Sequence, residues 1–302
     1  MYCNTEEMLR DARENSYAIG AFNISNMEFA KAIIKASEEM NTPVILQASE
    51  SACKYAGYDE LVQMVKCMAE KSPSKIALHL DHGKSFEVCK KAIDAGFSSV
   101  MIDLSGLSFE ENIKGTKEVV EYAKARNVSV ESELGEIIGV EDEQVSDVSH
   151  FTDPKKAKEF VEKTGITSLA VSIGTAHGAN KGATEPKIRF DILEELDKAL
   201  PGFPLVCHGA SRVDKKLVDK FKEFGGEISK AQGIPTEAIK QMSTASPIVK
   251  INCDTDLRIC FAGAIREFLA KNPTVFDPRK ILGYASEKIC EYVKECMALF
   301  KN

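Results

Sequence analysis

The sequence predicts an α/β protein, a (β/α)8 TIM barrel formed by residues 1–302 as one domain, with extra C-terminal helices. Three observations predict it. Eight short apolar segments alternate with longer helical patterns, as in parallel βα units. One apolar segment, 76–83, ends in an acid, an imidazole and a glycine, and barrels place their chemistry at the C-terminal ends of strands. A chain of 302 residues, 44% of them hydrophobic, can bury one large core.

The eight predicted strands are short apolar or β-branched runs, most of which end in a polar or ionisable residue. They are 18–24, 43–49, 76–82, 99–105, 129–135, 168–174, 204–211 and 248–255. Eight parallel strands are the number that closes a barrel of this class.

Helical patterns fill the intervals between the strands. They cover 27–40, 59–70, 86–95, 108–126, 154–163, 190–199, 214–224, 235–242 and 257–270, and 278–300 forms one or two helices outside the barrel. Asn26 is expected to cap the helix after the first strand, and Thr152 the one that begins at Asp153 and Pro154. The polar connection 136–151 and the glycine-containing segment 176–187 are expected to be mobile loops over the barrel mouth.

Composition excludes several classes of function. A net charge of −7 without a basic cluster argues against nucleic-acid or anionic-membrane partners. The N-terminal residues lack the pattern of a signal peptide, and no apolar run is long enough to span a bilayer, so we expect a cytoplasmic protein. The nine cysteines are odd in number and form no CxxC pair, which indicates reduced thiols.

Three of the five histidines, His82, His177 and His208, fall at the ends of predicted strands three, six and seven, and each precedes a glycine. Three neutral imidazoles around an open position are the ligand set of a catalytic zinc ion. The alternative is that each is a separate, hydrogen-bonded core histidine, which becomes less plausible with three equivalent positions. His79 lies inside its strand and His150 lies in the acidic loop, so neither shares the pattern.

Acidic residues also gather at the predicted strand ends. Asp81 directly precedes His82, and both can face the mouth only where the strand ends and curls. Asp81 is then a base toward a substrate hydroxyl or a partner that orients a histidine. Asp103 and Glu133 are either ligands of a second metal position or salt-bridge partners of lysines such as Lys181 or Lys230.

Two strand-to-helix junctions are candidate anion sites. The eighth strand ends in the run from Asn252 to Arg258, and strand seven is followed by Gly209, Ala210 and Ser211. Backbone N–H groups and hydroxyls at such junctions bind phosphate, and barrels reuse the loops after strands seven and eight for this purpose.

Taken together, six ordered motifs resemble the class II, metal-dependent fructose-1,6-bisphosphate aldolases over essentially the whole chain. The motifs are GAFN at 20–23, LHLDHG at 78–83, VESELG at 130–135, IGTAHG at 173–178, HGAS at 208–211 and KINCDTDLR at 250–258. There are two departures, Ile138 in place of a glycine in the acidic motif and Arg212 after HGAS, where glycine or serine is common.

The resemblance implies a role for each matched residue. His82, His177 and His208 would bind Zn2+, Asp103 and Glu133 a second or displaced metal, and Asp81 would transfer a proton at the hydroxyl of the cleaved bond. Glu141, rather than Glu143, would move the proton on the triose carbon. The substrate would contact Asn23, Ser49, Gly178, Lys181, Gly209, Ala210, Ser211, Asn252, Cys253, Asp254, Thr255 and Arg258.

The implied reaction is the reversible cleavage of fructose 1,6-bisphosphate to dihydroxyacetone phosphate and glyceraldehyde 3-phosphate, a step of glycolysis and gluconeogenesis. It implies a homodimer or homotetramer, and it leaves open a K+ or Na+ ion at the phosphate. A tagatose-1,6-bisphosphate aldolase is the nearest alternative, and a non-catalytic phosphosugar-binding barrel with structural zinc is a remote one. A lysine Schiff-base aldolase is disfavoured because the strand ends offer imidazoles instead of a lysine in apolar surroundings.

Overall fold

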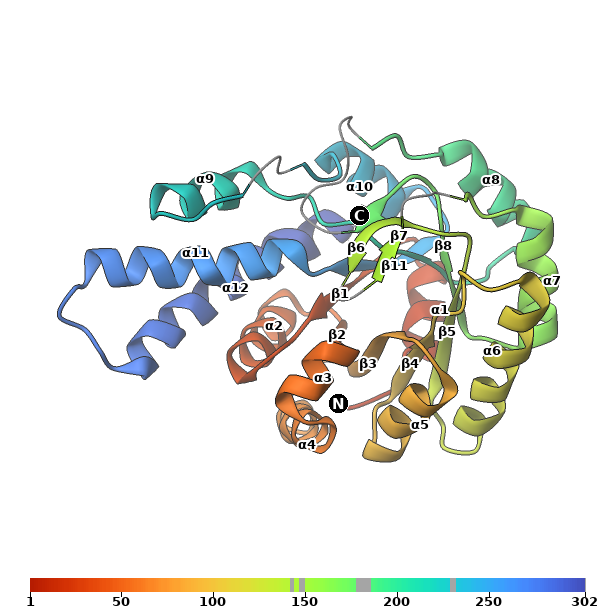
Figure 1. Ribbon diagram of the computed structural model, residues 1–302, viewed down its shortest axis with the longest axis horizontal. Helices are drawn as coiled ribbons and strands as arrows, with labels where there is room; N and C mark the ends of the chain where they lie inside the picture. The colour runs from red at the N-terminus through yellow and green to blue at the C-terminus, as the bar shows by residue number, and fades with distance from the viewer. Residues whose placement is uncertain (142–143, 147–149, 178–185, 229–231, 302) are drawn as a thin grey trace.

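The computed structural model describes residues 1–141, 144–146, 150–177, 186–228 and 232–301, and the side chains of 138–141, 144–146 and 177 lie outside this description. Its centre is a closed barrel of parallel strands in the order β1-β11-β10-β8-β5-β4-β3-β2 (Figure 1). The barrel strands are β1 (Ile19–Asn23), β2 (Val44–Ser49), β3 (Ile76–Gly83), β4 (Ser99–Ile102), β5 (Ser129–Leu134), β8 (Ser168–Val171), β10 (Leu205–Cys207) and β11 (Ile248–Cys253). All eight predicted strands are therefore confirmed.

Helices surround the barrel (Figure 1). They are α1 (Glu6–Glu14), α2 (Met27–Met40), α3 (Glu50–Ala56), α4 (Tyr58–Ala69), α5 (Phe86–Ala95), α6 (Phe109–Lys124), α7 (Pro154–Thr164), α8 (Phe190–Ala199), α9 (Lys215–Glu223), α10 (Thr236–Thr244), α11 (Thr255–Lys271) and α12 (Pro278–Phe300). The C-terminal segment forms one continuous helix. None of the helices described is long and apolar enough to cross a membrane.

The helix caps correct one prediction. Asn26 caps α2, because its side chain accepts a hydrogen bond from the backbone N–H of Phe29, as expected. The cap of α7 is Asp153 and not Thr152, since the Asp153 carboxylate accepts from two backbone N–H groups of the first turn. The Thr152 hydroxyl instead donates to the carbonyl of Leu134, which ties the loop to the end of β5.

Sequence periodicity missed two short helices and a small sheet. The helix α1 packs Met8 and Leu9 against Ile19 and Val249 in a cluster separate from the main core. The helix α3 begins directly at the end of β2. The segment 136–151, expected to be a mobile loop, contains β6 (Ile138–Glu141) and β7 (Gln144–Ser146). The strand β6 pairs with β7 on one side and with β9 (Ala176–His177) on the other.

The helices α11 and α12 form a long hairpin that extends away from the barrel, with α9 lying along it (Figure 1). Glu267 of α11 joins the three helices, because its carboxylate accepts from Lys220 of α9, Lys271 and the hydroxyl of Tyr284 of α12. Burial alone would raise the pKa of Glu267, but these donors outweigh it and lower the pKa to about 2.

We therefore expect the hairpin to be sensitive to acid. A carboxyl group whose pKa is lower in the folded state contributes stability above its unfolded pKa, and this stability is lost as pH falls toward the folded pKa. Between about pH 4.5 and 2, the melting temperature of the wild type should fall more steeply than that of Glu267→Gln. Thermal unfolding followed by circular dichroism across this range tests the expectation, and parallel curves for the two proteins would contradict it.

Candidate active site and metal centre

The end of β3 brings two neighbouring side chains to the barrel mouth. His82 has a φ of 47°, a left-handed conformation, and the register between β3 and β4 shifts between Leu80 and Gly83. Neighbours in a regular strand point to opposite faces, so this bulge is what allows Asp81 and His82 to lie in one site. The sequence predicted a curl at this position, and the structure confirms it.

Asp81 is surrounded by amide groups from neighbouring strands. Its Oδ2 accepts hydrogen bonds from Asn23 Nδ2 at 2.9 Å and Gln47 Nε2 at 3.2 Å, and its Oδ1 accepts from Asn252 Nδ2 at 3.3 Å. Gln47 also donates to Asn23 Oδ1 at 2.7 Å. Gln47 was missed by the sequence analysis, although an amide inside the apolar run of β2 was the signal that could have found it. The three amides fix the direction of the carboxylate.

His82 and His208 face each other across the mouth. Nε2 of His82 lies 2.8 Å from Nδ1 of His208, and the two rings are nearly perpendicular. The outer nitrogen of each ring contacts a carboxylate: His82 Nδ1 lies 2.8 Å from Asp103 Oδ2, and His208 Nε2 lies 2.7 Å from Glu131 Oε1. Two strands on opposite sides of the barrel thus bring two imidazoles together.

The protonation of this group follows from its surroundings. Burial alone would raise the pKa of Asp103 and of Glu131, but His82 beside Asp103 and Lys250 beside Glu131 hold both values well below the usual range. Burial lowers the pKa of His208, which favours its neutral form. An ionised carboxylate can only accept, so each outer ring nitrogen is the one that donates.

The donor set therefore fits a metal ion. Once the outer nitrogens carry the protons, the inner nitrogens of His82 and His208 present two lone pairs to each other at 2.8 Å, an arrangement that a cation between them stabilises. Histidine ligands that donate their other N–H to a carboxylate are the usual arrangement at protein metal sites. Asp81, His82 and His208 form one candidate group, in which each residue offers a ligand atom within 4.8 Å of those of the other two.

A second candidate metal group contains His82, Asp103 and Glu133, whose ligand atoms also lie within 4.8 Å of one another. Asp103 accepts from the backbone N–H and hydroxyl of Ser105 as well as from His82. Asp103 and Glu133 thus belong to a candidate metal group, as one of the two alternatives raised from the sequence expects. The lysines named for such bridges, Lys181 and Lys230, lie outside the described residues.

Below the histidines lies an ion pair that the sequence analysis did not assign. Lys250 Nζ lies 2.9 Å from Glu131 Oε2 inside the barrel, where their side chains are 0% and 1% exposed. His79 is buried beside them, inside its strand as the sequence indicates, with Nε2 3.9 Å from Glu131 Oε2 and Nδ1 2.7 Å from the Ser99 hydroxyl. Glu131 therefore links the buried lysine to His208.

The predicted phosphate-site residues meet at the junction of β10 and β11 with α11. Gly209 has a φ of 61°, and a Cβ there would lie 2.6 Å from the carbonyl oxygen of Ala176, so only glycine fits. The backbone N–H of Asp254 lies 3.4 Å from the Ser211 hydroxyl. The remaining predicted residues here are Ala210 and Asn252, both buried, and Thr255, the first residue of α11.

Three other predicted substrate contacts, Cys253, Arg258 and Ser49, lie outside this junction or at its edge. The Cys253 side chain packs in the outer core beside Cys296 of α12, so only its backbone can serve the mouth. Arg258 is more than half exposed and makes a two-point ion pair with Asp254, with Nη2 2.7 Å from Oδ2. Ser49 caps α3 and pairs in register with Asp81, which places it at the rim of the mouth.

Two predicted site residues, Gly178 and Lys181, lie outside the described residues. For His177 and Glu141 the structure describes the backbone alone. The backbones of β6 and β9 run side by side, with Gly139 paired to His177, so the segments that carry Glu141 and His177 adjoin.

The comparisons with known proteins agree on one family. Residues 3–302 match the family model for class II fructose-bisphosphate aldolase. The fructose-bisphosphate aldolase of Thermus caldophilus is 49% identical over 296 residues, which cover 97% of this chain and 96% of that protein. The fructose-bisphosphate aldolase of Giardia intestinalis is 45% identical over 96% of this chain and 90% of its own length.

A comparison with a solved structure supports the fold. The YdjI aldolase of Escherichia coli K12 superposes with a TM-score of 0.81 at 31% identity, over 99% of this chain and 97% of that one. A full-length family match and relatives that share nearly half of the residues leave one assignment: the chain belongs to the class II fructose-bisphosphate aldolase family.

Proposed function

We propose that this protein reversibly cleaves fructose 1,6-bisphosphate to dihydroxyacetone phosphate and glyceraldehyde 3-phosphate. The observation that carries the proposal is the arrangement of the mouth, where the Asp81 carboxylate lies beside two imidazoles whose inner nitrogens are 2.8 Å apart. A base next to a candidate metal position is what cleavage of a carbon–carbon bond beside a ketone requires.

The metal proposed for this site is zinc, with His82, His177 and His208 as its ligands. When bound, zinc would act as a Lewis acid that polarises the ketone oxygen of the substrate. Asp103 and Glu133 would hold a second or displaced metal, for which the candidate group they form with His82 is the support. A K+ or Na+ ion at the phosphate remains part of the proposal.

The residues of the chain supply binding and proton transfer. Asp81 takes the proton from the hydroxyl beyond the cleaved bond, and Asn23, Gln47 and Asn252 hold its carboxylate in place for this step. Glu141 moves the proton on the triose carbon. The phosphate of the triose half binds at the junctions after β8, β10 and β11, and the residues assigned to it are Gly178, Lys181, Gly209, Ala210, Ser211, Asn252, Cys253 and Thr255.

The far half of the sugar would meet Asp254 and Arg258, with Ser49 at the rim. More than half of the Arg258 side chain is exposed, so it can reach the site of a neighbouring subunit in a homodimer or homotetramer. A cytoplasmic location belongs to the same proposal, and it is supported by the nine cysteines, which are odd in number and form no CxxC pair.

Removal of the metal is expected to abolish turnover. Dialysis against a chelator should stop the formation of triose phosphate from fructose 1,6-bisphosphate, and added Zn2+ should restore it, because the imidazole pair loses and regains its cation. A coupled assay for triose phosphate follows the reaction, and circular dichroism shows that the fold survives chelation. Activity that persists in metal-free protein would contradict the metal mechanism.

The same assay separates the alternatives. Faster cleavage of tagatose 1,6-bisphosphate than of the fructose isomer would reassign the substrate. Tight binding of both sugars without any turnover would favour a phosphosugar-binding barrel.

A further inference from the structure

The turn after β10 contains a strained residue next to the phosphate-site junction. Val213 has a φ of 47°, a conformation in which a β-branched side chain is a genuine outlier. Its side chain is buried against Val218 of α9 and Ile259 of α11. Nothing in the side chain explains the backbone conformation, so its cause must lie in the contacts of the turn.

One carboxylate accounts for the conformation. Asp256, the second residue of α11, is fully buried, and each of its oxygens accepts a backbone N–H from one side of Val213. The N–H of Arg212 lies 2.8 Å from Oδ2 and the N–H of Asp214 lies 2.8 Å from Oδ1. Two N–H groups that flank a left-handed residue form an anion-binding nest, and here the anion is a side chain of the protein itself. The nest stabilises the φ that Val213 would otherwise avoid.

The same turn is held from other sides. The carbonyl of Ser211 accepts from the N–H of Ile234 at 3.1 Å. A Cβ on Gly233 would lie 1.9 Å from the carbonyl oxygen of Arg212, so the segment before α10 packs directly against the turn. The Ser211 hydroxyl meets the N–H of Asp254 at 3.4 Å. The turn is thereby fixed to the first residues of α11, which form the other half of the junction.

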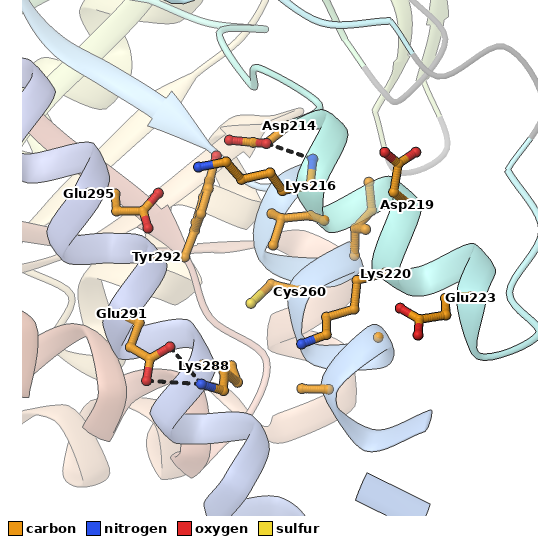
Figure 2. Close-up of a pocket in the computed structure, with 14 residues that line it drawn as sticks. Asp214, Lys216, Asp219, Lys220, Glu223, Cys260, Lys288, Glu291, Tyr292 and Glu295 are labelled. Atoms are coloured by element: carbon orange, nitrogen blue, oxygen red, sulfur yellow. Dashed lines mark hydrogen bonds and ion pairs between the residues drawn. The ribbon is translucent and has the colours of Figure 1, made fainter. Parts of the chain in front are cut away.

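Arg212, which stands where the family pattern commonly has glycine or serine, connects the turn to α12. Its guanidinium lies 5.2 Å from the centre of the Tyr292 ring and 3.5 Å from Asp214 Oδ2, and its Nη2 lies 3.9 Å from the sulfur of Cys296. Figure 2 shows Tyr292 extending from α12 toward Asp214, at the wall of a cavity of about 410 Å3 between α9, α11 and α12. The turn is thus fixed to both helices of the hairpin.

We propose that Asp256 is a positioning residue that holds the turn 211–214 in the shape in which Ser211 and its neighbours bind the phosphate end of the substrate. The proposal rests on the assignment of the phosphate to this junction. Asp256 is buried behind the turn and does not touch the substrate. Its effect therefore falls on phosphate binding more than on the chemical step.

The test replaces the carboxylate with an amide of the same shape. In Asp256→Asn, the amide NH2 faces one of the two N–H groups, so one hydrogen bond is lost. We expect KM for fructose 1,6-bisphosphate to rise about tenfold, the value of one charge-assisted hydrogen bond, while kcat changes much less. The dissociation constant of inorganic phosphate, read from the rise in melting temperature with phosphate concentration, should increase by a similar factor.

A second substitution distinguishes this role from simple stabilisation. Glycine adopts a positive φ without strain, so adding Val213→Gly to Asp256→Asn should bring KM and the phosphate dissociation constant back toward the wild-type values. Val213→Gly also removes a buried side chain, so it should lower the melting temperature further. Recovery of binding in a less stable protein is a result that a purely structural role of Asp256 cannot give.

Two more variants complete the experiment. Asp277→Asn makes the same change at a carboxylate that caps α12 through the N–H of Arg279, far from the mouth, and should leave KM unchanged. If Asp256→Asn does not fold, Gly233→Ala displaces the same turn from its other side and should also weaken phosphate binding.

The results of this experiment can be distinguished from the results of the test of the proposed function. Phosphate binding that weakens in Asp256→Asn and recovers in the double variant supports the positioning role, even if the wild type does not cleave fructose 1,6-bisphosphate. Unchanged phosphate binding in Asp256→Asn, or weakened binding that Val213→Gly does not restore, would overturn it. A wild type that binds no phosphate would overturn it as well.

Discussion

The variant Asp81→Ala is expected to cleave fructose 1,6-bisphosphate about 10²- to 10⁴-fold more slowly than the wild type, the usual contribution of a general base. The residue is almost fully buried at the mouth, and three amides direct its carboxylate. The loss should appear in kcat, since the proton is transferred in the transition state and not in substrate binding. Steady-state kinetics with a coupled triose phosphate assay measure both constants.

Metal content decides how this result is interpreted. Asp81 also belongs to a candidate metal group, so the variant must be shown to retain its metal by elemental analysis. An inactive variant with full metal content identifies Asp81 as the base, whereas an inactive variant without metal would assign it to the metal site. Asp81→Asn keeps the size of the side chain and should be equally slow, and Asp219→Ala, which removes an exposed carboxylate on α9, should be fully active.

Replacing Lys250 with methionine should destabilise the protein by about 3–5 kcal/mol, because Glu131 is left as a buried charge without its partner. Both side chains are at most 1% exposed, so water cannot replace the lost ammonium group. Glu131 also orients His208, and the variant should therefore bind its metal more weakly. Urea unfolding gives the free energy, and elemental analysis after dialysis gives the retained metal.

A second substitution tests the cause of this loss. In Lys250→Met with Glu131→Gln the buried charge is gone, and the amide oxygen still accepts from His208, so most of the stability should return. Lys288→Met, which breaks an exposed ion pair with Glu291, should cost about 1 kcal/mol or less. If Lys250→Met lowers the free energy of unfolding as little as Lys288→Met does, the buried ion pair contributes little to stability and Glu131 is protonated in the folded protein.

Much of the site follows from local sequence. The eight strands were found from short apolar runs, and the residues that end them meet because parallel strands all terminate at one rim. Strand ends alone therefore place Asp81, His82 and His208 in one mouth. The curl at the end of β3 was also predictable, since two adjacent residues cannot otherwise serve one site.

The partners of these residues could not be read from the sequence. Lys250 and Glu131 are separated by more than a hundred positions in the sequence. The alternation of side chains along a strand indicates only that each of them points into the barrel. Cys253 was assigned to the substrate by motif position, and only the structure shows that the alternation of β11 turns its side chain toward α12. The sequence analysis also missed the helix α1, because this helix has no partner strand in the repeating pattern of strands and helices.

Strand periodicity and strand ends are local properties of the chain, so the barrel, its mouth and the ionisable residues gathered there follow from local sequence. The contacts between atoms arise in the closed barrel, where the inner nitrogens of His82 and His208 face each other and the carboxylate of Asp256 lies beneath the turn at Val213. These contacts depend on the register between distant strands and on side-chain packing, which are set only when the barrel closes.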